Sequence, residues 1–295
     1  MAVPLVGSGS GTDVQNTLAQ VLSANGVSAV SRCYSNCPVP YGKDLSVEYD
    51  SSIRGESRFN GISWYSVEIK TRVLNGIDDW EAVVPKTLEI CQYMGARTNS
   101  SCGFHLHVAL PEASERVAVI RNIFNLFYRF EPVIFALVAP SRRTCGYSNP
   151  IALERAKLFQ GCKADSSFRR KLLNWDRKMG LNLTHLLQGK KLSSTPRVEF
   201  RYHHGTLNTE KAGNWIRFIL QMTEHACTRS CQASEQVSNS RKGLEQLLLT
   251  CGFKVNSRIY SKVSPELRQT GKYLIRRWKK FNGSVPLKTA EFSLK

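Results

Sequence analysis

Four segments of this chain alternate polar and apolar side chains with a period of two, the pattern of a β-strand that is buried on one face. They span residues 46–50, 64–70, 104–110 and 197–203. Because successive side chains of a strand point to opposite faces, each segment has one face that must be covered. The apolar face carries Val47, Tyr49, Tyr65, Val67, Ile69, Phe104, Leu106, Val108, Val198, Phe200 and Tyr202. The pattern therefore predicts a half-buried sheet.

Helical segments between these strands can supply the cover, because their apolar side chains recur every three or four residues. They lie at residues 77–94, 112–130 and 210–226, and an earlier helix begins after a cap at Thr12 or Asp13 and ends at Asn25 and Gly26. An antiparallel sheet with helices on one side and a polar face on the other is an α+β layer. We expect the functional site on the open polar face.

That polar face carries charged groups suited to phosphoryl transfer. Its members are Glu48, Asp50, Ser66, Glu68, His105, His107, Glu199, Arg201 and His203. Carboxylates hold Mg²⁺ between phosphates, and arginines neutralise phosphoryl oxygens in the transition state. Other interpretations stay open: Glu199 and Arg201 could form a surface ion-pair ladder. His105 and His107 could be a packing pair or two ligands of a zinc-dependent hydrolase.

Short motifs follow one another in a fixed order over about residues 44–225. Residues 48–52 contain a D-x-S element, and residues 66–69 form a further acidic strand. Residues 95–108 are similar to a GA-x-x-N-x-S-C-G-x-H-V-H run. Further stretches are similar to R-x-x-x-x-Y (142–147), D-R-Y-x-x-L-N-L-x-A-L (176–186) and E-F-R-x-x-x-G-T-L (199–207). In this order, the motifs resemble those of the putative amidoligase family.

The resemblance implies a fold like the catalytic domain of glutamine synthetase and γ-glutamylcysteine ligase: a curved antiparallel sheet that binds ATP and Mg²⁺ or Mn²⁺. It implies an ATP-dependent carboxylate–amine ligase that works through an acyl phosphate. The implied metal ligands are Glu68, His105 and Glu199, with Glu48 as a further candidate. The implied nucleotide contacts are His107, Arg143, Arg177 and Lys178, and the implied catalytic residues are Arg201, Arg142 and Asp50.

One strand departs from the family pattern. The family's first strand resembles F-G-V-E-L-E and supplies two metal-binding glutamates, whereas this chain has Pro4 and Val6 in an apolar segment. Three explanations are open: a truncated or misassigned start, compensation by another acid such as Glu48, or loss of catalysis with the fold retained. Loss of two negative ligands should weaken metal binding.

Positive charge is concentrated at the C-terminal end. Residues 236–295 contain thirteen Lys and Arg against three acidic residues, and so carry +10 of the net +18. We place a domain boundary near residue 235, between a catalytic domain (1–235) and a basic helical extension (236–295). Its main helix begins at Ser264 and Pro265. The extension suits nucleic acid or another polyanion, and an inactive polyanion-binding protein is the alternative function.

Nine cysteines, an odd number in a chain of this size, do not form a disulfide framework pattern. Cys33 with Cys37, and Cys227 with Cys231, have spacings that could hold zinc. No apolar run reaches the length of a membrane span, and residues 1–6 are too short and uncharged for a signal peptide. We therefore expect a cytoplasmic protein. No pattern in the sequence identifies the carboxylate substrate, the amine substrate or the oligomeric state.

Overall fold

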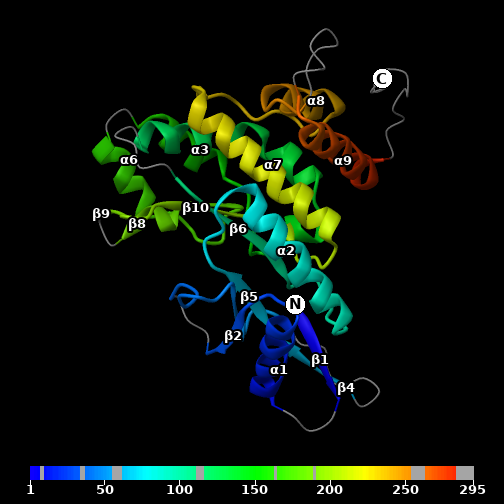
Figure 1. The fold of residues 1–295 in the computed structure, drawn as a ribbon. Helices are drawn as coiled ribbons and strands as arrows, with labels where there is room; N and C mark the ends of the chain where they lie inside the picture. The colour runs from blue at the N-terminus through cyan, green and yellow to red at the C-terminus, as the bar shows by residue number, and fades with distance from the viewer. Residues whose placement is uncertain are drawn as a thin grey trace. The chain divides into compact units, whose positions relative to one another are not determined.

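The computed structural model describes residues 1–6, 10–33, 37–54, 62–110, 116–162, 165–188, 191–253 and 263–283 (Figure 1). The chain divides into two compact units. The first contains Met1–Phe104 and His204–Trp215, and the second contains His105–His203 and Ile216–Lys295. Helices and strands occur in both, which confirms the α+β class. None of the helices in these described ranges is long and apolar enough to cross a membrane.

The first unit contains small sheets rather than one large one. Its strands are β1 (Ala2–Val6), β2 (Ala29–Arg32), β3 (Leu45–Glu48), β4 (Ile62–Ser66) and β5 (Glu68–Thr71). Strand β1 pairs antiparallel with β4, while β3 lies between β2, which is parallel to it, and β5, which is antiparallel. The prediction of one antiparallel sheet built from all four alternating segments is therefore wrong.

The reason for the split lies at Val67. Its backbone N–H donates to the Met1 carbonyl at 2.9 Å, and the Met1 amino group donates back to the Val67 carbonyl at 2.8 Å. The predicted strand 64–70 thus changes partner at this residue, from β1 to β3. Strand β3 also ends one residue before Tyr49, which is 51% exposed and not in the core as predicted.

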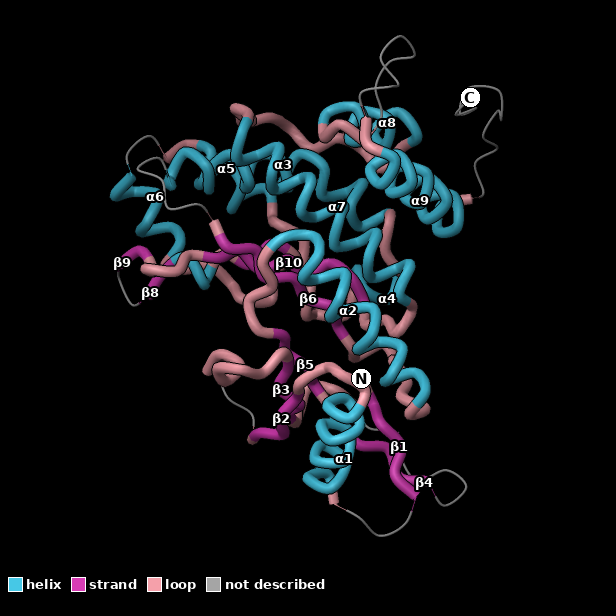
Figure 2. Tube along the Cα trace, in the orientation of Figure 1, coloured by secondary structure: helices cyan, strands magenta, loops and turns pink. Residues whose placement is uncertain are grey.

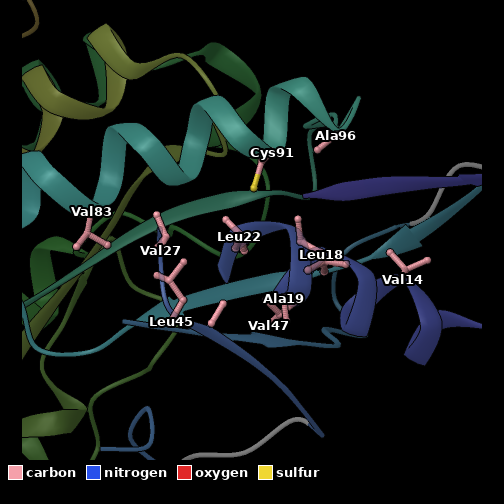
Figure 3. Packing of buried hydrophobic residues seen from close by; sticks show 12 residues of the cluster. Val14, Leu18, Ala19, Leu22, Val27, Leu45, Val47, Val83, Cys91 and Ala96 are labelled. Carbon is pink, nitrogen blue, oxygen red and sulfur yellow. The ribbon is translucent and has the colours of Figure 1, made fainter. Parts of the chain in front are cut away.

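Helix α1 (Gly11–Ala24) begins with a capping box. The Ser10 hydroxyl accepts from the Asp13 N–H, and the Asp13 carboxylate accepts from the Ser10 N–H, so the cap is Ser10 and not Thr12 or Asp13. The helix ends at Asn25 and Gly26, as predicted, because Gly26 adopts a φ of 78°. Its apolar face packs on β3 and on α2 (Gly76–Tyr93) around Leu18, Leu22, Leu45, Val47 and Cys91 (Figure 3).

The second unit is built on a sheet with the order β6-β10-β7. These strands are β6 (Gly103–Ala109), β7 (Leu181–Asn182) and β10 (Arg197–His204), and a small hairpin joins β8 (Leu187–Gln188) to β9 (Lys191–Leu192). Helix α3 (Arg116–Ala136) covers one face of this sheet (Figure 2). The Phe127 ring lies 4.6 Å from that of Phe200, between centroids, and Phe135 lies 5.2 Å from Tyr202. Residues 112–115 of the predicted helix lie outside the described ranges.

The remaining helices belong wholly or partly to the second unit. They are α4 (Pro140–Arg143), α5 (Leu153–Gln160), α6 (Asp165–Leu172), α7 (Thr209–Thr228), α8 (Arg241–Thr250) and α9 (Pro265–Asn282). Helices α8 and α9 both pack on α3 and belong to the second unit (Figure 1). The boundary near residue 235 stays a prediction about which segments fold independently.

Helix α9 begins as predicted, since the Ser264 hydroxyl accepts from the Leu267 N–H and Pro265 takes the first helical position. Its buried face includes Leu274, Trp278 and also the cationic Arg277. The Arg277 side chain donates to the Leu137 carbonyl at 3.4 Å and lies over the Phe281 ring. This contact removes one cation from the exposed face.

Candidate active site

Strand β10 presents two chemically different faces, as its alternation predicts. Val198, Phe200 and Tyr202 are fully buried on the side covered by α3. Glu199 and Arg201 therefore point to the opposite side, where they meet histidines of the neighbouring strand β6. His203 is the next residue in phase with Glu199 and Arg201, and like Glu199 it is buried.

The Glu199 carboxylate is the centre of this face. Its Oε1 accepts from Arg201 Nη1 and lies 3.3 Å from His105 Nδ1, while its Oε2 accepts from Asn182 Nδ2 at 2.6 Å. His185 Nε2 donates to the same Oε2 at 3.3 Å. Burial by itself would raise the pKa of Glu199, but the hydrogen bond from His185 and the positive groups around it outweigh burial. The pKa of Glu199 therefore lies below the usual glutamate range, and the group is a carboxylate.

His105 is a neutral ring with polar contacts at both nitrogens. Arg142 Nη2 lies 3.2 Å from its Nε2. Its Nδ1 lies 3.3 Å from Glu199 Oε1 and 3.5 Å from Arg201 Nη1. Burial and the charge of Arg201 lower the pKa of His105 to about 3. Both of its nitrogens are thus occupied.

His107 and His185 are arranged differently, because Arg197 donates to both. Arg197 Nε donates to His107 Nδ1 at 3.3 Å, and Arg197 Nη2 contacts His185 Nδ1 at 3.4 Å. Each ring therefore keeps its proton on Nε2, and both Nε2 atoms are directed at Glu199. Burial lowers the pKa of His107 to about 4, although Glu199 opposes this shift.

The other predicted arginines and lysine have different places in the second unit. Arg142 is buried and donates to the Arg201 carbonyl through Nε at 3.0 Å and Nη2 at 2.7 Å, so it anchors β10. Arg143 donates to the Phe135 carbonyl at 2.7 Å. Arg177 and Lys178 are exposed, and the Lys178 ammonium lies 5.4 Å from the Tyr147 ring centroid. Of these four, only Arg142 contacts the Glu199 cluster, through His105 and Arg201. This cluster consists of His105, His107, Asn182, His185, Arg197, Glu199 and Arg201.

The predicted acids Glu48, Glu68 and Asp50 lie in the first unit. Glu48 and Glu68 are cross-strand partners on β3 and β5, and the Lys70 ammonium lies 2.6 Å from Glu48 and 3.5 Å from Glu68. Burial raises the pKa of Glu68, and the charges of Asp50 and Glu48 add to the effect while Lys70 opposes it. Asp50 Oδ1 accepts from the Ser52 N–H at 2.8 Å. A lysine thus supplies the cation that two facing carboxylates require.

Neither group of side chains fits a resident Mg²⁺. This ion prefers several oxygen ligands in octahedral geometry. The Glu199 cluster offers one carboxylate, already hydrogen-bonded at both oxygens, and otherwise imidazole nitrogens. The carboxylates of Glu48 and Glu68 already hold Lys70. The metal roles of Glu48, Glu68, His105 and Glu199 stay predictions.

Sequence reasoning missed three members of the Glu199 cluster: Asn182, His185 and Arg197. Asn182 is the asparagine of the L-N-L motif, and its place in that motif was the available indication. His185 stands where the pattern of that motif has alanine, and this departure was the available indication. Arg197 is in phase with Glu199 and Arg201 on β10 and could have been found from the strand's alternation.

One protein-family model matches most of this chain. A model of the putative amidoligase enzyme family matches residues 9–223, a range that begins after β1 and ends within α7. No curated protein and no solved structure matches the chain significantly. The family match includes every residue of the Glu199 cluster. Since it spans well over half of the sequence, the chain belongs to the putative amidoligase enzyme family.

Proposed function

We propose that this protein is an ATP-dependent carboxylate–amine ligase that forms an amide through an acyl phosphate. Family membership indicates a ligase, and the finer statement rests on the chemistry of the β10 polar face. Mg²⁺ or Mn²⁺ would arrive with the triphosphate as part of the substrate.

The observation that carries the proposal is the position of Arg201. Its Nη1 donates to Glu199 and its Nε donates to the Tyr147 carbonyl at 3.2 Å, so the guanidinium is fixed in orientation. Its Nη2 has no acceptor among the residues that the structure describes. A fixed fork with one unused edge suits a phosphoryl group or a substrate carboxylate.

The reaction would proceed in two balanced steps. A substrate carboxylate oxygen attacks the γ-phosphorus of ATP, the bond to the β-phosphate oxygen breaks, and ADP leaves. The amine nitrogen then attacks the acyl carbon, the carbon–oxygen bond to phosphate breaks, and phosphate leaves with the proton that the amine loses. Arg201 would stabilise the charge on the phosphoryl oxygens in both steps.

Hydroxylamine provides a direct test, because it traps acyl phosphates as hydroxamates. With MgATP, L-glutamate as the probe carboxylate and hydroxylamine, we expect ADP and hydroxamate in equal amounts. Arg201→Lys should slow turnover by about 10²-fold while leaving nucleotide binding nearly intact, because a lysine cannot reproduce the fork. Arg170→Lys on exposed α6 is the matched control and should leave turnover unchanged.

Two results would contradict the proposal. One is the absence of MgATP binding in calorimetry, which would remove the nucleotide from the mechanism. The other is an Arg201→Lys protein with the parent's turnover and melting temperature. That result would mean that Arg201 only forms an ion pair on the strand, which stabilises the fold by less than ~1 kcal/mol.

One observation favours a second function, polyanion binding by an amidoligase-like protein without activity. The outward side of α9 carries Arg268, Lys272, Arg276, Lys279 and Lys280, at spacings that align them on one face. Nucleic acid is the proposed partner, because evenly spaced phosphates match such a row of cations.

A further inference from the structure

We propose that His107, His185 and Glu199 form a binding site for a zinc-type divalent ion, and that Arg197 must leave the two imidazoles before the ion binds. The inference does not depend on the proposed ligase reaction. It concerns nitrogen ligands that Mg²⁺ disfavours and that Zn²⁺, Co²⁺ and Ni²⁺ favour.

The three ligand atoms are already close together. His107 Nε2 lies 3.8 Å from Glu199 Oε1, and His185 Nε2 lies 3.3 Å from Glu199 Oε2. One ligand atom from each residue can be chosen so that all three lie within 4.8 Å of one another. Ligands at about 2.0–2.1 Å from a tetrahedral zinc are roughly 3.3 Å apart, so only small movements are needed.

Neighbouring groups hold the carboxylate in place. Asn182 Oδ1 accepts from the N–H and the hydroxyl of Thr184, at 2.9 and 2.8 Å. This fixes the amide orientation, so that Nδ2 donates to Glu199 Oε2. Arg201 donates to the other oxygen. Such outer contacts orient metal ligands in known sites.

Arg197 is the exception, and it opposes metal binding as it stands. A ring that binds metal through Nε2 must carry its proton on Nδ1, and that N–H normally donates to a carbonyl or carboxylate. Here both Nδ1 atoms face N–H donors of Arg197. Two donors facing each other repel, so the metal-bound tautomers of His107 and His185 exclude the Arg197 contacts.

The proton balance of this exchange is simple. Each neutral ring moves its proton from Nε2 to Nδ1, and the freed Nε2 lone pair binds the ion. Arg197 is partly exposed and can turn toward solvent. The imidazoles release no net proton, so the inference requires only rearrangement and a divalent ion.

Metal binding by the full-length protein without nucleotide tests the inference. After chelator treatment, the parent should bind one Zn²⁺ in competition with a zinc indicator, and millimolar Mg²⁺ should not displace it. Co²⁺ should give ligand-field bands of a four-coordinate N/O site. All measurements use a Cys33→Ser, Cys37→Ser, Cys227→Ser, Cys231→Ser background, so that both cysteine pairs are removed.

Two variants address the two parts of the inference. His185→Ala should weaken Zn²⁺ binding by about 100-fold or more, because it removes a ligand. Arg197→Gln should tighten binding by roughly 10-fold, because a glutamine carbonyl can accept from Nδ1–H. His225→Ala on α7, a histidine outside the cluster, is the matched control and should bind Zn²⁺ like the parent.

Several results would overturn the inference. They are no bound Zn²⁺ in the parent, unchanged affinity in His185→Ala, or displacement of Zn²⁺ by Mg²⁺. Weaker binding in Arg197→Gln would refute the role of Arg197, with circular dichroism confirming that the variant is folded. Because nucleotide is absent, none of these outcomes bears on the ligase proposal.

Discussion

Glu131 is a buried carboxyl group that lies outside the Glu199 cluster. Its Oε2 accepts from the Ile151 N–H at 2.8 Å, and its Oε1 accepts from the Tyr202 hydroxyl at 2.9 Å. Burial raises the pKa of Glu131 to about 7, although both hydrogen bonds oppose the shift. Glu131 therefore joins α3 to the buried face of β10, and its contribution to the free energy of unfolding depends on pH.

We predict that Glu131 makes the free energy of unfolding fall as pH rises. The folded state keeps its proton up to a pKa of about 7, whereas the unfolded chain loses it near the ordinary glutamate pKa of 4.5. Stability from this group is thus full below about pH 4.5 and is lost as pH rises through about 7. Glu131→Gln removes the titration.

Urea denaturation at pH 5 and pH 7.5 measures this effect. The stability of Glu131→Gln relative to the parent should be greater at pH 7.5 than at pH 5, by about 2 kcal/mol. A difference that is the same at both pH values would show that Glu131 is already ionised in the folded protein at pH 5.

At the scale of elements, strand β10 depends on a close approach of the Gly180 backbone to Arg201 and to the Tyr202 ring. The Gly180 carbonyl accepts from the Arg201 N–H at 2.7 Å, and its N–H donates to the Asn149 carbonyl at 2.8 Å. A Cβ added at Gly180 would overlap the Tyr202 ring. The backbone that holds Arg201 therefore requires glycine beside the strand.

We predict that Gly180→Ala lowers the free energy of unfolding by about 1–3 kcal/mol, because overpacking displaces the Tyr202 ring. Tyr202→Leu supplies a matched background without the ring. There the cost of Gly180→Ala should shrink, giving a favourable coupling in a double-mutant cycle measured by chemical denaturation. Equal costs in both backgrounds would mean that Tyr202 is not what limits this position.

At the scale of the whole molecule, the distribution of charge decides the proposed polyanion binding. Deleting residues 236–295 would remove the cations but would also expose the surfaces that α8 and α9 bury against α3. Neutralising exposed side chains separates these effects. The helix core, including Leu274 and Trp278, stays intact in such variants.

We predict that the triple variant Lys272→Gln, Arg276→Gln, Lys280→Gln weakens binding to an oligothymidine probe. The slope of log affinity against log salt should become shallower by roughly 2, since about 0.7 arises from each single-strand phosphate contact. Fluorescence anisotropy across a salt series measures it. Neutralising Arg169, Arg170 and Lys171 of α6 is the control. An equal loss there would indicate a general charge effect, and not a site on α9.

The sequence alone determined which side chains share a face, because strand and helix periods are properties of the backbone. Period two placed Glu199 and Arg201 opposite Val198, Phe200 and Tyr202, and the structure confirms it. The start of α9 at Ser264 followed from capping chemistry, which is equally local. Motif order indicated the family that the matched model shows.

Only the tertiary structure decided which distant segments meet. The predicted strand 64–70 changes partner at Val67, which pairs with Met1, and Lys70 lies close to both Glu48 and Glu68. His185 joined the site because β7 and β10 pair and bring the segment after β7 to Glu199 and Arg197. Periodicity is local and repeats along one element, whereas such contacts depend on how separate elements pack, which no short stretch of sequence encodes.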